Sequence, residues 1–253
     1  MNLADMSVLV TGGGRGIGRY LVDRFQQDAA RVAVLERDPA LCQELLQNQN
    51  ARGDYTIARE CDVSDASSVD RCLAELFKTG FTPDVLVNNA GIIHSEPLIN
   101  LLKKSDRVHS RETWHAVIRT NLDSVFFVTS RVVERMIESR RKGVVVSVSS
   151  IAARGNAGQT AYSASKAGVN ALTRTWAKEL GPLGLRFAAI APGFMDTVST
   201  HDALSESTVQ KLKQHIPLRR LGGVEHIYLA IRHVIENEYV TGTVLEVDGG
   251  LTL

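Results

Sequence analysis

The residue types best placed to do chemistry in this sequence are a tyrosine and a lysine four positions apart, Tyr162 and Lys166. In a helix, residues i and i+4 share a face, so the phenol and the ammonium would be neighbours. A nearby cation favours the phenolate, which predicts a tyrosine pKa lowered toward neutrality, as acid–base catalysis near pH 7 requires. Ser149 stands thirteen residues before the tyrosine. These three residues predict an acid–base site, whereas a surface Tyr/Lys pair is the alternative.

A glycine cluster lies where a short apolar run gives way to a helical segment, in Thr11-Gly12-Gly13-Gly14-Arg15-Gly16-Ile17-Gly18. Glycine lets the backbone turn sharply and approach a ligand closely. The unpaired N–H groups at a helix start favour a negative charge there. The segment therefore predicts a diphosphate site in the strand–turn–helix context of a dinucleotide fingerprint, and a ligand-free turn is the alternative.

An acidic residue, Glu36, ends the second apolar run about twenty residues downstream of the glycines. A carboxylate there can hydrogen-bond both hydroxyls of an adenosine ribose and would repel an added 2′-phosphate, which favours NAD(H). Arg15 and Arg37 argue for NADP(H), since guanidinium groups bind phosphate well. We give Glu36 the greater weight and keep NADP(H) as the alternative.

Polar and small residues also follow the third and fourth apolar runs, in Cys61-Asp62-Val63 and Asn88-Asn89-Ala90-Gly91. Asp62 can accept a hydrogen bond from an adenine amino group, and Gly91 lets the chain pass close to a flat ligand. Each segment alone is typical of an ordinary turn. Because they follow successive strands, we expect them to share one ligand.

Short apolar runs and longer helical segments alternate along the chain and must position these groups. The predicted strands are Ser7-Val10, Arg31-Leu35, Thr56-Arg59, Val85-Val87, Val144-Val148, Leu185-Ala191 and Val244-Val247. The predicted helices include Gly18-Asp28, Ala66-Lys78, Glu112-Ser139 and Ala161-Leu180. Several strands are apolar at consecutive positions, so both faces are expected to be covered. The predicted fold is a doubly wound parallel α/β sheet of the Rossmann type, with excursions near residues 93–111 and 194–217 that are expected to cover the substrate.

Composition excludes several classes of partner. With 29 Lys and Arg against 28 Asp and Glu, the net charge is +1, whereas an unspecific nucleic-acid or membrane-surface binder carries a basic excess. No apolar run is long enough to span a membrane. Three cysteines without a paired spacing suggest neither disulfides nor a metal site. We expect a cytoplasmic protein with no nucleic-acid, membrane or metal partner.

The order of motifs resembles the short-chain dehydrogenase/reductase family, and in particular its 3-oxoacyl-carrier reductases. The segments that carry the resemblance span roughly residues 5 to 250 and are TGGGRGIG, CDV, NNAG, Thr120-Asn121-Leu122, the Ser149 strand end, YSASK, Ala191-Pro192-Gly193 and Val247-Asp248-Gly249-Gly250. The resemblance implies one catalytic domain over residues 1–253. It also implies a homodimer or homotetramer, with the helix after Tyr162 at a dimer face.

The resemblance implies a role for each catalytic residue. Tyr162 would exchange a proton with the substrate oxygen, and Ser149 would hydrogen-bond that oxygen. Lys166 would lower the tyrosine pKa and hold the nicotinamide ribose, and Asn121 would anchor a water that links the lysine to solvent. Ser150 is adjacent to Ser149, and only the spacing to Tyr162 favours Ser149.

The same resemblance places further residues along the cofactor. The glycine motif would receive the diphosphate, Asn89 would line the cleft, and the Pro192-Gly193 turn with Thr197 would fix the carboxamide. The full predicted cofactor set is Gly12, Arg15, Gly16, Ile17, Gly18, Glu36, Arg37, Asp62, Val63, Asn89, Ala90, Gly91, Tyr162, Lys166, Pro192, Gly193 and Thr197.

The activity implied is NAD(P)(H)-dependent interconversion of a secondary alcohol and a ketone, with a 3-oxoacyl thioester as the favoured substrate. The alternative within the family is a polyol, sugar or secondary-metabolite dehydrogenase. The alternative outside enzymology is a dinucleotide-binding regulator without catalysis, which would need no Tyr162 or Lys166. The basic run Arg140-Arg141-Lys142 ends a helix and is a candidate docking point for an acidic acyl carrier protein.

Overall fold

The computed structural model describes residues 3–28, 30–49 and 56–252 and contains all seven predicted strands, each within one residue of its predicted ends. The strands are β1 (Ser7–Thr11), β2 (Arg31–Glu36), β3 (Thr56–Glu60), β4 (Val85–Asn88), β5 (Gly143–Val148), β6 (Leu185–Pro192) and β7 (Thr243–Val247). The α-helices are α1 (Gly16–Gln27), α2 (Pro39–Gln49), α3 (Ala66–Lys78), α4 (Arg111–Ile118), α5 (Ser124–Glu138), α6 (Thr160–Leu180), α7 (Val198–Ala203), α8 (Glu206–His215) and α9 (Val224–Glu236).

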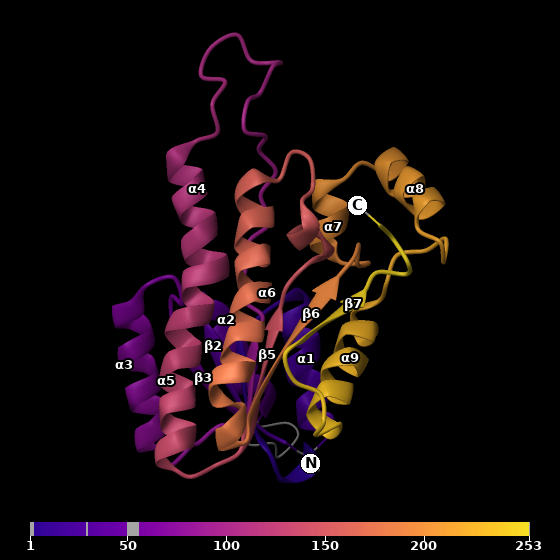
Figure 1. The fold of residues 1–253 in the computed structure, drawn as a ribbon. Helices are drawn as coiled ribbons and strands as arrows, with labels where there is room; N and C mark the ends of the chain where they lie inside the picture. Colours follow the sequence, from indigo (N-terminus) through magenta and orange to yellow (C-terminus); the bar gives the residue numbers. More distant parts are fainter. Residues whose placement is uncertain (1–2, 29, 50–55, 253) are drawn as a thin grey trace.

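The seven strands form one parallel sheet in the order β3-β2-β1-β4-β5-β6-β7 (Figure 1). The order reverses direction between β1 and β4, which is the arrangement of a doubly wound fold. The predicted fold class is confirmed.

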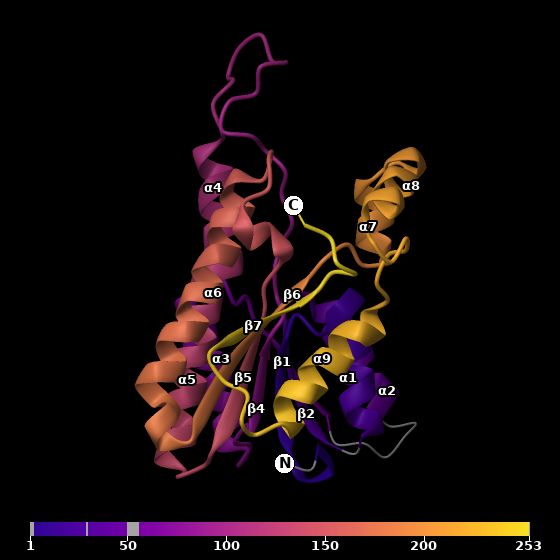
Figure 2. The same ribbon diagram turned by 45° about the vertical axis from the view of Figure 1, so that its right-hand side comes forward.

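Helices cover both faces of the sheet, with α3, α5 and α6 on one side and α1, α2 and α9 on the other (Figure 2). The two faces alternate along β1, since Val8 and Val10 belong to the core beside α1 and α9 while Leu9 belongs to the core beside α3 and α5. All three are fully buried. This is why the strand is apolar at consecutive positions rather than at every second one.

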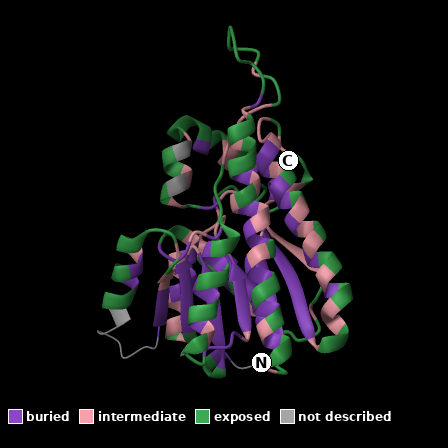
Figure 3. Ribbon diagram, turned by 90° about the vertical axis from the view of Figure 1, so that its left-hand side faces the viewer, coloured by how far each residue is buried: buried purple, intermediate pink, exposed green. Residues whose placement is uncertain are grey.

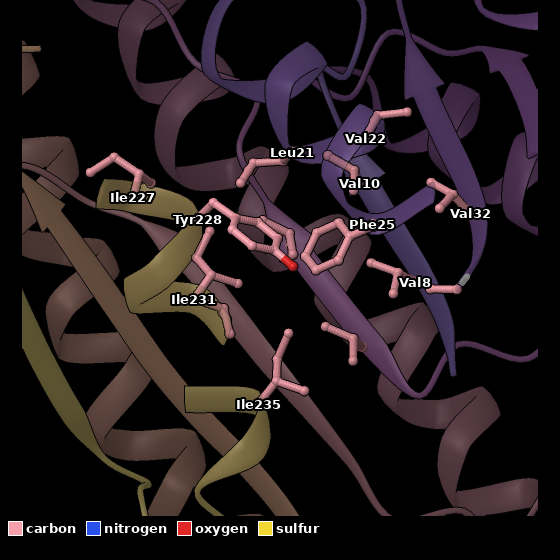
Figure 4. Close-up of a cluster of buried hydrophobic side chains, with 14 of the residues drawn as sticks. Val8, Val10, Leu21, Val22, Phe25, Val32, Ile227, Tyr228, Ile231 and Ile235 are labelled. Atoms are coloured by element: carbon pink, nitrogen blue, oxygen red, sulfur yellow. The ribbon is translucent and has the colours of Figure 1, made fainter. Parts of the chain in front are cut away.

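The core on the α1 and α9 side is built around two aromatic rings (Figure 4). Phe25 of α1 meets Tyr228 of α9 edge to face, with the ring centroids 5.6 Å apart. The Tyr228 hydroxyl donates to the Asp28 carboxylate at the end of α1, so the buried phenol is not left unpaired. The contact joins the first and last α-helices at the C-terminal end of α1.

The long helix predicted over Glu112-Ser139 is three segments in the structure. Helices α4 and α5 are joined by a π-helical turn, η2 (Arg119–Asp123). A π turn holds one more residue than an α turn, so it changes which side chains face the sheet. Asn121 lies in this turn and is fully buried.

Both predicted excursions leave the carboxyl edge of the sheet. One carries α7 and α8, and the other is a narrow hairpin that stands beyond α4 (Figure 1). Burial colouring shows buried strands, helices that are buried on one side only and a hairpin that is exposed along most of its length (Figure 3). The catalytic motifs lie at this same edge.

Candidate active site

The glycine loop fits against the ends of β1 and β4 because it has no side chains where the backbones meet. Gly12 adopts φ +64°, and a Cβ there would lie 2.9 Å from Ala90 Cα. A Cβ on Gly18 would collide with the Gly12 carbonyl oxygen and would come within 2.5 Å of Asn89 Nδ2. Asn89 Nδ2 also donates to that carbonyl at 2.9 Å. These positions require glycine on steric grounds.

The start of α1 has the properties of a diphosphate site. Its N-cap residue, Arg15, makes no side-chain capping hydrogen bond, so the first N–H groups are not used by a capping side chain. Gly16 adopts φ +57°, and a Cβ there would meet no atom within 4 Å. The open space in front of a positive helix end fits a dinucleotide diphosphate. Arg15 itself is exposed.

Glu36 ties the end of β2 to the glycine loop. Its Oε2 accepts a hydrogen bond from Gly14 N at 2.9 Å, and its Oε1 accepts from Arg37 N at 2.8 Å and Asp38 N at 3.2 Å. The carboxylate therefore lies beside the loop, at the position predicted for an adenosine ribose. The Arg37 side chain is exposed.

The next strand ends bring further predicted residues to the same edge. Asp62, after β3, accepts hydrogen bonds at its Oδ1 from Ser64 N at 3.0 Å and Ser64 Oγ at 2.7 Å. Val63 beside it is buried. Thr11 was not predicted as a site residue. In the structure, its Oγ1 accepts hydrogen bonds from Asn89 N at 3.0 Å and Ala90 N at 3.1 Å. Its place at the end of β1, next to the glycines, is the signal that could have identified it.

Asn121 joins the π turn to the segment after β4. Its Oδ1 accepts from Ile92 N at 2.8 Å, and its Nδ2 donates to Ile92 O at 2.9 Å. The two bonds hold the Gly91 region close to the helix, where a Cβ on Gly91 would lie 3.1 Å from Asn121 Oδ1 and 3.6 Å from Lys166 Nζ. Asn121 is thus a positioning group for the segment that faces Lys166.

Tyr162 and Lys166 lie near the start of α6, one turn apart as predicted. Lys166 Nζ is 5.8 Å from the centre of the Tyr162 ring and donates to Val148 O at 2.7 Å. Only 9% of Tyr162 and 5% of Lys166 is exposed. The phenol ring packs with Val117, Ala152 and Ala161. The pair is therefore held in an apolar wall at the carboxyl edge of the sheet.

Ser149, the serine predicted beside the tyrosine, turns its hydroxyl toward the backbone of α6. Ser149 is 2% exposed, and its Oγ donates to Lys166 O at 3.3 Å. Ser150 is the serine whose side chain lowers the pKa of the Tyr162 phenol. Alternation explains this orientation: Ser147 points toward the α5 side, where Asn88 Nδ2 donates to its Oγ at 3.3 Å, and Ser149 follows it two residues later. Counting residues to the tyrosine does not take this alternation into account, and the choice between Ser149 and Ser150 stays a prediction to be tested.

The pKa of Tyr162 also differs from the prediction. Burial raises the pKa of this phenol, and the hydrogen bond with Ser150 lowers it by less. Burial also lowers the pKa of Lys166 to about 8. The ammonium is directed to the Val148 carbonyl, and a low-dielectric site disfavours the phenolate and the ammonium alike.

The remaining predicted cofactor residues lie at the ends of β6 and α7. Pro192 ends β6, and Gly193 N donates to Val247 O at 3.0 Å. A Cβ on Gly193 would lie 2.8 Å from Asp248 Cα, so glycine is needed there as well. Thr197 is the N-cap of α7, where its Oγ1 accepts from Thr200 N at 3.3 Å.

The described residues carry neither a metal-binding cluster nor a membrane-spanning helix. In residues 3–28, 30–49 and 56–252, no group of three or more His, Cys, Asp or Glu side chains is arranged to hold a metal ion. Over the same described part of the chain, no helix combines the length and apolar character needed to cross a bilayer.

Comparison with known proteins decides the family. The family model described as short chain dehydrogenase matches residues 6–208. The chain belongs to the short-chain dehydrogenase family. It is therefore an oxidoreductase of the CH–OH/C=O type, and the open diphosphate site described above fits the nicotinamide dinucleotide that this family implies.

Two relatives of this short-chain dehydrogenase match over nearly its whole length. It is 36% identical over 262 residues to human (3R)-3-hydroxyacyl-CoA dehydrogenase, covering 98% of this chain and 96% of the relative. It is also 36% identical over 256 residues to the 3-oxoacyl-[acyl-carrier-protein] reductase of Thermotoga maritima, covering 100% of both.

Solved structures agree on the fold. A protein from Agrobacterium tumefaciens assigned as a gluconate dehydrogenase superimposes with a TM-score of 0.90 at 30% identity, covering 99% of this chain and 97% of that one. A 4-hydroxyisoleucine dehydrogenase complexed with NADH superimposes with a TM-score of 0.88 at 24% identity, covering 97% and 98%.

Removing the buried ammonium of this short-chain dehydrogenase should stabilise it. The pKa of Lys166 is about 8 in the folded chain against an ordinary 10.5, so the unfolded chain binds more protons between these values. The resulting penalty is complete below pH 8 and disappears above about pH 10.5. We expect Lys166→Met to raise the free energy of unfolding by about 1–2 kcal/mol at pH 7, after loss of the hydrogen bond to Val148.

Denaturant unfolding of both proteins at pH 7 and pH 10 measures this effect. The gain should shrink at the higher pH, and Lys166→Arg, which keeps a cation, should show no gain. A Lys166→Met protein that is no more stable than wild type at pH 7 would contradict the prediction.

Proposed function

We propose that this chain is an NAD(H)-dependent 3-oxoacyl-thioester reductase that also runs in reverse as a 3-hydroxyacyl dehydrogenase. The observation that carries the proposal is Tyr162, which is buried one helical turn from Lys166 and whose pKa the Ser150 side chain lowers. A phenol, a second hydroxyl and an ammonium are the groups that a carbonyl oxygen needs as it gains negative charge. The names of two relatives at 36% identity support the substrate class.

The roles of the side chains follow from their positions. Bound nicotinamide supplies or accepts the hydride. Tyr162 donates its proton to the substrate oxygen in reduction and takes one back in oxidation. Ser150 donates a hydrogen bond to the same oxygen, in place of the Ser149 predicted from the sequence. Lys166 places a cation beneath both, and Asn121 holds the Gly91 segment against it.

The raised pKa of Tyr162 favours the reductive direction. At neutral pH the phenol is protonated, which is the form that donates a proton to a ketone oxygen. Oxidation of an alcohol needs the phenolate, so its rate should rise with pH. The burial that raises this pKa thus suits a reductase.

The position of Glu36 supports NAD(H). Its carboxylate is held beside the glycine loop by three backbone N–H groups, so it cannot easily turn away from a 2′-phosphate. Arg15 and Arg37 are exposed side chains that a phosphate could recruit, and they remain the argument for NADP(H).

The wall that the α8 region forms beside the site is apolar. Val209 and Ile216 of the α8 region pack with Ile151, Leu221 and Leu251 into one buried cluster. Ile151 directly follows Ser150, so this cluster lies next to the proposed catalytic hydroxyls. An apolar wall suits an acyl chain better than a polyol.

Substitutions separate the roles of the hydroxyls. Tyr162→Phe should lower kcat at least about 100-fold, the usual contribution of a general acid, while cofactor affinity stays nearly unchanged. Ser150→Ala should also lower kcat by about tenfold or more, because it removes a hydrogen bond to the charge-bearing oxygen.

Ser149→Ala is the matched control, since its hydroxyl is turned toward Lys166 O. Steady-state assays of nicotinamide absorbance measure all three variants. If Ser149→Ala loses more activity than Ser150→Ala, the proposed role of Ser150 is wrong.

Glu36 is tested by cofactor affinity. The wild-type chain should bind NADH more tightly than NADPH, and Glu36→Gln should reduce that ratio by about tenfold, which corresponds to ~1.4 kcal/mol. Glutamine keeps an oxygen acceptor for the loop but removes the repulsive charge. Fluorescence titration with both cofactors is the measurement, with Glu44→Gln as a control on the neighbouring helix. Equal or tighter binding of NADPH by the wild type would overturn the preference.

A substrate panel tests the reaction itself. We expect acetoacetyl-CoA and longer 3-oxoacyl thioesters to be reduced at least about tenfold more efficiently, in kcat/KM, than sugar acids or polyols are oxidised. Faster turnover of gluconate-like substrates would instead favour the activity named for the Agrobacterium structure. A protein that binds NADH but turns over no member of the panel would be a binding protein rather than an enzyme.

A further inference from the structure

A cavity, called the slot below, opens beside Tyr162 between the chain segment after β4 and the first turns of α4. It has a volume of about 360 Å³, and small-molecule sites usually occupy about 300–1,000 Å³. Val117 of α4 lines the slot and packs in the same buried cluster as Tyr162. Ile92 also lines it and follows Gly91, where a Cβ would lie 3.6 Å from Lys166 Nζ. The slot is therefore one side chain away from the proposed catalytic pair.

The segment that lines the slot is fixed to the helix that carries Tyr162. Ser95 Oγ accepts a hydrogen bond from Gln159 Nε2 at 3.3 Å. Thr160 N donates to Glu96 O at 3.4 Å. Both bonds join the segment after β4 to the start of α6. A wall that is fixed before a ligand arrives lowers the ordering cost of binding.

Buried polar atoms without hydrogen bonds gather at one end of the slot. Among the described residues, six buried side-chain N and O atoms form no hydrogen bond, and three of these are His94 Nε2, Glu96 Oε2 and His109 Nε2. His94 lines the slot, and its Nε2 lies 3.4 Å from Glu96 Oε2, beyond the charge-assisted range of about 2.7–2.9 Å. Unpaired buried polar atoms are costly, so this concentration points to a ligand that supplies the missing partners.

The polar end of the slot has the chemistry of an amide site. Burial acts to raise the pKa of Glu96, but the Ser110 backbone and the imidazoles of His94 and His109 lower it overall. The ionised carboxylate accepts hydrogen bonds only, whereas an imidazole can donate or accept. An amide offers an N–H donor and a C=O acceptor together, which suits this pair. An alkyl chain would leave both groups unpaired.

The 3-oxo carbon of the proposed substrate carries two arms that leave it in different directions. One arm is the acyl chain, and the other is the thioester with its pantetheine, which contains amide groups. The apolar cluster around Val209 and Ile216 of α8 suits the acyl chain. Helices α4 and α8 stand on opposite sides of the carboxyl edge of the sheet in two views (Figures 1 and 2). The pantetheine arm is then the one that leaves on the α4 side.

We propose that the slot binds the pantetheine arm of a 3-oxoacyl thioester, with His94 and Glu96 pairing with one of its amides. Ile93, Ala116 and Val117 give the slot an apolar lining for the methylene groups of the same arm. His94 is thus a specificity-determining residue, which separates thioesters from ketones that lack this arm. The inference rests on the proposed function, because the arm belongs to its substrate.

Ketones with and without the amide arm test the slot. Wild type should reduce acetoacetyl-CoA at least about tenfold more efficiently, in kcat/KM, than ethyl acetoacetate, which has the same 3-oxo group without pantetheine. Ala116→Trp should fill the slot and lower kcat/KM for acetoacetyl-CoA at least about tenfold, with less than about a twofold change for ethyl acetoacetate. Ala74→Trp, at an exposed alanine of α3, should alter neither. Unchanged NADH affinity shows that each variant is folded.

The hydrogen bond of His94 is tested by a matched set of variants. His94→Leu should raise KM for acetoacetyl-CoA about fivefold with kcat nearly unchanged, as loss of a single hydrogen bond does. His94→Gln keeps a donor and an acceptor and should restore most of the affinity. His115→Leu, at an exposed histidine of α4, is the control and should leave KM unchanged.

The outcomes separate this inference from the proposed function. A wild-type chain that reduces no acetoacetyl thioester overturns the proposed function, and the inference falls with it. If thioesters are reduced but the slot variants act equally on both ketones, or change only the preference for acyl-chain length, the inference alone is overturned. Pantetheine is common to coenzyme A and acyl carrier proteins, so the slot variants should lower kcat/KM for acetoacetyl groups on either carrier. The wild-type rates with the two carriers identify the one that this chain uses.

Discussion

All seven strands of the sheet run in the same direction, and the site depends on this constraint. Parallel strands place every carboxyl end at one edge. The glycine loop, Glu36, Asp62, Asn89, Ser150 and Pro192 are far apart in the sequence but follow or end six different strands. No single loop could hold all of them at fixed distances. The buried cores on both faces of the sheet hold the strands, and therefore that edge, in place.

A second constraint acts within the helices. The π turn at residues 119–123 inserts Asn121 into the interior, where it binds both backbone groups of Ile92. This fastens the segment after β4 to the helical column, and Gly91 leaves room for Lys166 Nζ. The lysine then bonds to the Val148 carbonyl at the end of β5. The site is therefore tied together by side chains that bond to backbone at strand ends, and it does not depend on one mobile loop.

Much of this could be predicted from the sequence, for physical reasons that differ between elements. Consecutive apolar residues predicted the strands, because a sheet covered on both faces needs them, and helical spacing placed Tyr162 and Lys166 one turn apart. The sequence alone cannot choose between Ser149 and Ser150, because the choice depends on which face each residue takes beyond the end of β5. The pKa of Tyr162 was predicted in the wrong direction because burial is a property of the folded wall around it and cannot be counted along the chain. The π turn left no signal in the periodicity of residues 112–139, and the sequence showed an excursion at residues 93–111 without showing that its leucines would be exposed.

The hydrogen bonds of Glu36 have a consequence for attempts to redesign coenzyme use. One carboxylate serves as the proposed ribose contact and as the acceptor for the Gly14, Arg37 and Asp38 N–H groups. A residue chosen only to admit a phosphate would leave three donors without an acceptor and would loosen the loop that has to receive the diphosphate. In this chain, the same carboxylate therefore affects both the choice of coenzyme and the order of the glycine loop. A successful redesign would need to replace the acceptor as well as remove the charge.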